Sequence, residues 1–139
     1  MISLQLAQEL KKAGLVWKTS IHDFFAIPDR DMDDKLFVIS DLMVTMEILK
    51  GWPAMTFHGT AEWAADYIWT HDVIWMPTES QLREELERLL PENSNLCLRK
   101  IENQYLCEWQ DEQRPYSVNA PTAPEAYAQA LLQILPNFA

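Results

Sequence analysis

The segment from Trp75 to Pro91 constrains the fold more tightly than any other stretch of this sequence. An apolar run, Val73 to Met76, leads directly to Thr78, which stands three residues before Gln81. This spacing is a capping box, in which both side chains bond backbone N–H groups that the first helical turn leaves free. Leucines then recur at helical spacing until Pro91: Leu82, Leu86, Leu89 and Leu90. The segment predicts a strand followed by an amphipathic helix over 79–90.

Caps predict a helix near each end of the chain. Ser3 precedes apolar residues at helical spacing, and Gly14 offers a left-handed stop, so a helix is expected over 4–13. Thr122 is the expected cap of a last helix, because Pro124 and Glu125 suit its first turn.

Two more helices are predicted in the first half of the chain. Residues 41–50 carry apolar side chains that fit one helix face, with Gly51 as the stop. Thr60 can cap a second helix that places Trp63 and Tyr67 one turn apart and ends near Thr70.

The remaining apolar segments are short, β-rich and separated by turn residues. They predict a hairpin from residues 22–27 and 35–39, a strand over 54–58, and a second hairpin from 96–101 and 104–110 with 116–118 beside it. A two-residue turn at 102–103 would set Leu98 opposite Cys107 and leave Cys97 on the other sheet face, so no disulfide is expected.

Together these elements predict an α+β fold: a mainly antiparallel sheet of hairpins packed with about four or five helices. A chain of 139 residues without a recognisable linker or repeat fits a single domain over 1–139.

Charge and composition exclude several classes of partner. The formal net charge is −10, which repels phosphate backbones and anionic lipid, so neither nucleic acid nor a membrane is expected as a partner. The first residues lack the basic segment of a signal peptide, and no apolar run is long enough to cross a bilayer. We therefore expect a cytoplasmic protein with reduced cysteines.

No catalytic, cofactor-binding or metal-binding residue is assigned from motifs, and no cofactor is expected. The acidic segment 29–34 resembles a calcium loop, but Asp34 stands where such a loop needs glycine and Ser40 where it needs glutamate. His22, His58 and His71 come from three separate segments without metal-ligand spacing. A serine-hydrolase elbow and a phosphate-binding glycine loop are both absent from the sequence.

Aromatic residues crowd one part of the chain: Trp52, Trp63, Tyr67, Trp69 and Trp75. Core packing is one interpretation, and an aromatic groove for a peptide or small ligand is the other. On the predicted helix Trp69 points away from the stripe of Trp63 and Tyr67, so these rings cannot all lie in the same core. Trp69, and Trp52 beside the Gly51 turn, are therefore predicted to form an interaction surface.

The segment from Ala61 to Leu90, above all Trp75 to Arg83, resembles small bacterial proteins of uncertain function, some of which carry a pilus-assembly label. That resemblance implies a cytoplasmic accessory role and no catalytic residues.

Three functions are consistent with the sequence. The leading hypothesis is a non-enzymatic interaction or regulatory domain with a protein partner, for which a second copy of the chain is one candidate. The alternatives are a small-molecule-binding or metal-assisted enzyme that uses the aromatic cluster and the His–Asp pairs, and an acidic inhibitor or immunity-type protein. A flat apolar patch containing Trp69 would favour the first, a convergent His–Asp pocket the second and a concentrated acidic face the third.

Overall fold

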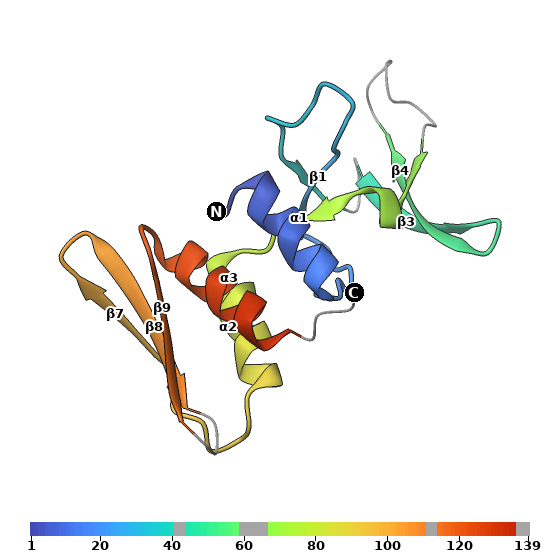
Figure 1. Ribbon diagram of the computed structural model, residues 1–139. Helices are drawn as coiled ribbons and strands as arrows, with labels where there is room; N and C mark the ends of the chain where they lie inside the picture. The colour runs from blue at the N-terminus through green and yellow to red at the C-terminus, as the bar shows by residue number, and fades with distance from the viewer. Residues whose placement is uncertain (41–43, 59–66, 111–113, 136–139) are drawn as a thin grey trace. The chain divides into compact units, whose positions relative to one another are not determined.

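The computed structural model describes residues 1–40, 44–58, 67–110 and 114–135 (Figure 1). The chain forms two compact units. The helical unit comprises Met1–Val16 and Pro77–Ala139, and the strand unit comprises Trp17–Met76, which interrupts the first unit in the sequence. A single domain over 1–139 stays a prediction.

The described part of the helical unit contains three α-helices and one sheet. The helices are α1 (Leu4–Ala13), α2 (Glu79–Leu89) and α3 (Ala123–Ile134). Each begins at its predicted cap. The hydroxyls of Ser3 and Thr122 accept bonds from backbone N–H groups in the first turn, and Gly14 ends α1 in the left-handed conformation. At α2 both bonds of the predicted capping box are formed. Within the described ranges, no helix is both long enough and apolar enough to span a membrane.

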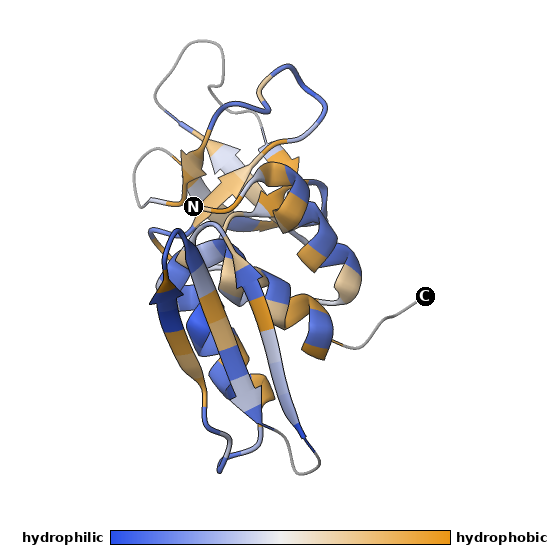
Figure 2. Cartoon of the chain, turned by 60° about the vertical axis from the view of Figure 1, so that its left-hand side comes forward, coloured by the Kyte–Doolittle hydropathy of each residue, from blue (hydrophilic) through white to orange (hydrophobic). Residues whose placement is uncertain are grey.

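The sheet of the helical unit has the order β7 (Cys97–Ile101), β8 (Gln104–Gln110) and β9 (Pro115–Ala120), all antiparallel. The predicted register is confirmed, because Leu98 pairs with Cys107 and both cysteines are free thiols. Polar and apolar residues alternate along these strands (Figure 2). Helix α3 contacts β8 and β9 as well as α1 and α2, so Cys107 and Trp109 are buried beneath it.

The strand unit contains two three-stranded antiparallel sheets. One has the order β2 (Phe37–Val38), β1 (Phe24–Ala26) and β6 (Ile74–Trp75), which confirms the first predicted hairpin. The other has the order β3 (Val44–Leu49), β4 (Trp52–Phe57) and β5 (Tyr67–Trp69), followed by a short 3-10 turn, η1 (Thr70–Asp72).

Both sheets contribute to one apolar core. Phe25 and Phe37 stack at 5.5 Å between ring centroids, and Phe37 meets the ring of Phe57 edge-on at 6.1 Å. The buried residues of this core come from both sheets and the segments beside them: Phe25, Ile27, Ile39, Val44, Met55, Phe57, Ile68 and Val73. Burial of this apolar surface is the main stabilising contribution within the unit.

The helix predicted over residues 41–50 is wrong, because residues 44–49 form strand β3. Lys50 and Gly51 both have positive φ and join β3 to β4 in a two-residue hairpin, in which Leu49 pairs with Trp52. A type I′ turn requires positive φ at both positions. The glycine interpreted as a helix stop is therefore a hairpin turn.

The helix predicted from Thr60 to Thr70 is wrong at its C-terminal end, where Tyr67–Trp69 form strand β5. Trp63 and the rest of that segment lie outside the described residues. The fold class α+β is confirmed, and its strands pair antiparallel in three separate sheets. Three α-helices are present in the described part of the chain, fewer than the four or five predicted.

We predict that Thr78→Ala lowers the free energy of unfolding by about 1 kcal/mol, because it removes the hydroxyl that accepts the Gln81 N–H at the start of α2. Urea denaturation followed by far-UV circular dichroism measures the loss. Ser80→Ala is the control, since Ser80 is an exposed residue inside the first turn of the same helix. Equal midpoints for wild type and Thr78→Ala would contradict the capping role.

Candidate functional site

The β3–β4–β5 sheet has two chemically different faces, because successive side chains in a strand point to opposite sides. One face turns Val44, Met55, Phe57 and Ile68 into the core of the strand unit. The other face follows from the register of the three strands: Leu49 pairs with Trp52, Glu47 with Ala54 and Ala54 with Trp69, and Thr56 pairs with both Thr45 and Tyr67. The two predicted interaction residues, Trp52 and Trp69, therefore share the face that is turned away from the core.

Four rings are linked on this face. The ring of His71 stacks on Trp69, with 6.3 Å between centroids and an interplanar angle of 8°. The same imidazole meets the ring of Trp52 edge-on at 6.2 Å. Tyr67 meets Trp69 edge-on at 5.1 Å. Trp52, Tyr67, Trp69 and His71 thus form a continuous aromatic surface, which we call the ring face.

The ring face is open to solvent to different degrees along its length. Trp52 is 61% exposed and Tyr67 is 43% exposed, whereas Trp69 is half-buried. Ala54, the cross-strand partner of Trp69, is fully buried. Trp69 therefore forms the inner part of the surface and Trp52 its exposed part.

Polar groups border the rings on the same sheet face. The carboxylate of Glu47 accepts a hydrogen bond from the Thr56 hydroxyl at 3.1 Å. His58 Nε2 lies 2.9 Å from Thr45 Oγ1. At the other end, His71 Nε2 lies 3.5 Å from a carboxylate oxygen of Asp72, and both side chains are more than half exposed. The ring face is thus bordered by a carboxylate on two sides.

The sequence contained a signal for the two rings that were not assigned to a surface. Tyr67, Trp69 and His71 stand at alternate positions, the spacing of one strand face. The helix predicted from Thr60 instead puts Tyr67 on a helical stripe with Trp63. A period of two over three residues is too short a signal to outweigh the helix cap at Thr60.

The acidic segment 29–34 forms a mostly exposed loop. Asp29 and Asp31 have positive φ, and the Asp29 N–H donates to the Asp33 carboxylate at 3.1 Å. Four aspartates line an open hollow there: Asp29, Asp31, Asp33 and Asp34. One carboxylate of the loop thus bonds the loop's own backbone.

The three histidines have different neighbours. His22 lies at a turn where its backbone N–H bonds the Ile39 carbonyl at 2.8 Å, while His58 bonds Thr45 and His71 packs between tryptophans. Among the residues that the structure describes, no group of three or more His, Cys, Asp or Glu side chains could hold a metal ion.

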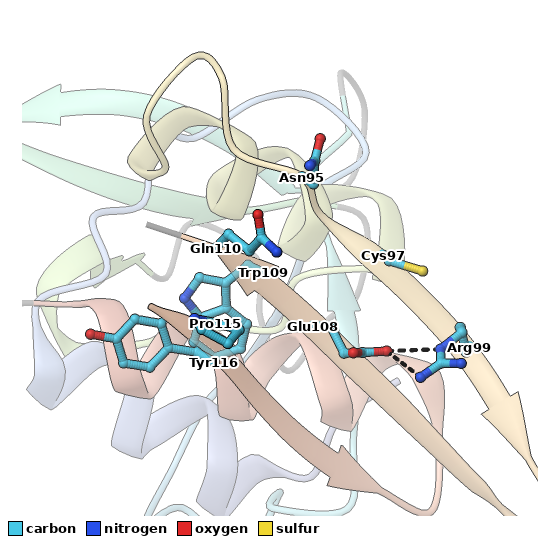
Figure 3. Close-up of a pocket in the computed structure, with 8 residues that line it drawn as sticks. All are labelled: Asn95, Cys97, Arg99, Glu108, Trp109, Gln110, Pro115 and Tyr116. Atoms are coloured by element: carbon cyan, nitrogen blue, oxygen red, sulfur yellow. Dashed lines mark hydrogen bonds and ion pairs between the residues drawn. The ribbon is translucent and has the colours of Figure 1, made fainter. Parts of the chain in front are cut away.

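A groove of about 240 Å³ lies on the β7–β8–β9 sheet (Figure 3). Among the residues that line it, Arg99 donates to Glu108 through Nε at 2.8 Å and Nη2 at 2.6 Å. Within the described lining, this pairing neutralises the charge of Arg99. The exposed thiol of Cys97 lies at its rim.

No protein-family model, no curated protein and no solved structure matches this chain.

We predict that micromolar calcium leaves the melting temperature unchanged, because the 29–34 loop lacks the glycine and the distal glutamate of a calcium loop. Differential scanning fluorimetry with calcium and with EDTA measures this. A rise of several degrees in wild type that Asp31→Asn abolishes would overturn the prediction.

The two cysteines should differ in reactivity. Burial raises the pKa of the Cys107 thiol from 9.0 to about 11, with smaller contributions from Cys97 and Glu108. A thiol-disulfide reagent near neutral pH should therefore modify Cys97 in the folded protein and Cys107 after unfolding. Below pH 9 the raised pKa does not affect the free energy of unfolding, because the Cys107 thiol is protonated in both states. As the pH rises from 9 towards 11 the free energy of unfolding falls, because the thiol loses its proton in the unfolded chain before it does so in the folded one. Cys97→Ser is the control, and fast modification of that variant would contradict the assignment.

Proposed function

We propose that this chain is a non-enzymatic interaction domain that binds a protein partner through the ring face. One observation carries the proposal: Trp52 remains 61% exposed although its ring is joined through His71 to Trp69. Exposed, connected aromatic rings are the surface type in which binding energy concentrates, because a partner that covers them removes a large apolar area from water.

The histidines and the Arg99–Glu108 groove support an enzymatic function less well than the ring face supports an interaction domain. His71 and Asp72 form a pair on the surface, the His58 imidazole bonds the Thr45 hydroxyl, and His22 lies at a separate turn. The Arg99–Glu108 groove holds a closed ion pair. An enzyme that used the exposed Cys97 thiol of this groove would need a base to activate it, and no histidine is among the described residues that line the groove.

Charge favours a different polypeptide over a second copy of the chain as the partner. Two chains that each carry a net charge of −10 repel one another. The two free thiols support a reducing compartment, and we place the protein in the cytoplasm on that basis. The resemblance of Trp75–Arg83 to bacterial proteins with a pilus-assembly label supports an accessory role in this proposal.

We predict that Trp52→Ala weakens partner binding by about 2 kcal/mol, roughly thirtyfold, and changes the unfolding midpoint little, because the ring lies mostly in solvent. The measurement is affinity capture from the native cell extract with wild-type and variant baits, quantified by mass spectrometry, followed by titration of the purified partner.

Ile48→Ala is the matched control, because Ile48 is a 70% exposed apolar residue on the same sheet that alternates to the opposite face. A partner that binds both variants as tightly as wild type would show that the ring face is not the contact surface. Trp69→Ala tests the inner part of the surface, but its half-buried ring means that it also costs stability.

A further inference from the structure

We infer that the ring face recognises a cationic polypeptide segment, in which a lysine or arginine side chain lies over the exposed ring of Trp52 with its charge at Glu47. This inference rests on the proposed function, since it names the chemistry of the partner at the same surface.

The rings supply an attractive surface for a cation. The face of an indole carries negative electrostatic potential, and a guanidinium or ammonium group placed over it is stabilised, most strongly over tryptophan. The imidazole of His71 already stacks on Trp69, so Trp52 is the ring with the larger exposed area. A planar guanidinium can stack there in the same way.

The strand register places a carboxylate within reach of that ring. Glu47 pairs with Ala54, and Trp52 precedes Ala54 by two residues, so Glu47 and Trp52 are diagonal neighbours on the same sheet face. Diagonal neighbours lie about 7–8 Å apart, a separation that a long side chain can span. The Glu47 carboxylate is exposed and held by the Thr56 hydroxyl, so it is available for a charge-assisted bond to the partner.

The sequence of the strand unit carries a surplus of acidic side chains, which favours a basic partner. Ten acidic and four basic side chains lie between Trp17 and Met76. Asp72 borders the rings beyond His71, and the basic residue nearest to Trp52 in the sequence is the exposed Lys50 of the hairpin turn. A segment rich in lysine or arginine therefore meets attraction over a wide area, whereas nucleic acid, which could stack bases on the same rings, meets repulsion.

The test compares two uniform peptides of equal length, poly-L-arginine and poly-L-citrulline, which differ in charge but hardly in shape. Each peptide is titrated into the full chain by isothermal calorimetry. The change in tryptophan fluorescence on binding is measured for wild type and for Trp52→Ala, and the difference between them is the contribution of Trp52. The variants Trp52→Ala and Glu47→Gln probe the two groups that hold the cation. Ile48→Ala controls for loss of an exposed apolar side chain, and Glu84→Gln on α2 controls for loss of one negative charge elsewhere.

We expect poly-L-arginine to bind wild type, Ile48→Ala and Glu84→Gln alike, to bind Trp52→Ala about thirtyfold more weakly, and to bind Glu47→Gln about threefold more weakly. Poly-L-citrulline should bind at least tenfold more weakly than poly-L-arginine. Equal binding of poly-L-arginine to all variants would mean unspecific attraction to an acidic protein and would overturn the inference.

Binding of a neutral oligosaccharide or of poly-L-citrulline that depends on Trp52 would also overturn it, and would assign the rings to an uncharged ligand. The proposed function is judged separately, by the captured partner. If that partner depends on Trp52 but binds Glu47→Gln and wild type equally, the ring face is the contact surface and the cationic chemistry is wrong.

Discussion

The pairing register of β3, β4 and β5 is the constraint on which the candidate surface depends. The two-residue turn at Lys50–Gly51 fixes the β3–β4 part of this register, since positive φ at both positions sets Leu49 opposite Trp52. A slip of one residue would exchange the faces of β3, because side chains alternate with a period of two. Val44 would then leave the core, and Glu47 would no longer lie on the face of Ala54 and Trp69. One tight turn therefore determines which side chains of β3 enter the apolar core and which lie on the ring face.

Elements whose signals are local could be predicted from the sequence. The caps at Ser3, Thr78 and Thr122 and the hairpin about residues 102–103 depend on residues that touch within one turn, and all are present. The segment 44–49 could not be predicted in this way. Its Met46, Glu47 and Leu49 suit a helix, and Gly51 suits both a helix stop and a hairpin. The choice between them depends on pairing with β4 and on burial of Val44 against Phe57, which are tertiary interactions.

The candidate site shows how an incorrect element can still lead to residues that share one sheet face. A helix over 60–70 could not bury every ring, and the same holds for the observed sheet, where Ile68 alone of β5 enters the core. The partners of Trp52 and Trp69 could not be identified without the register. Tyr67 lies on the same face as Trp69 because the two are separated by one residue in β5. Glu47 lies on that face because it pairs with Ala54, which in turn pairs with Trp69. His71 joins them because η1 returns its ring onto Trp69.

The ring of Trp52 and the carboxylate of Glu47 can contribute different amounts of binding free energy. A tryptophan side chain can bury about 150–250 Å², so covering most of an exposed ring is worth about 3 kcal/mol at roughly 25 cal/mol per Å². An ion pair between exposed groups contributes about 0–1 kcal/mol. Trp52 would therefore supply most of the affinity at this surface. In the proposed complex Glu47 would act mainly by discrimination: a cation over the ring would find its charge matched, whereas an anionic partner at the same ring would meet a carboxylate held in place by Thr56. Trp52 would bind many kinds of ligand, whereas Glu47 would favour those that carry positive charge. In the proposed complex the two groups together favour a basic polypeptide over the other ligands that an aromatic surface can bind.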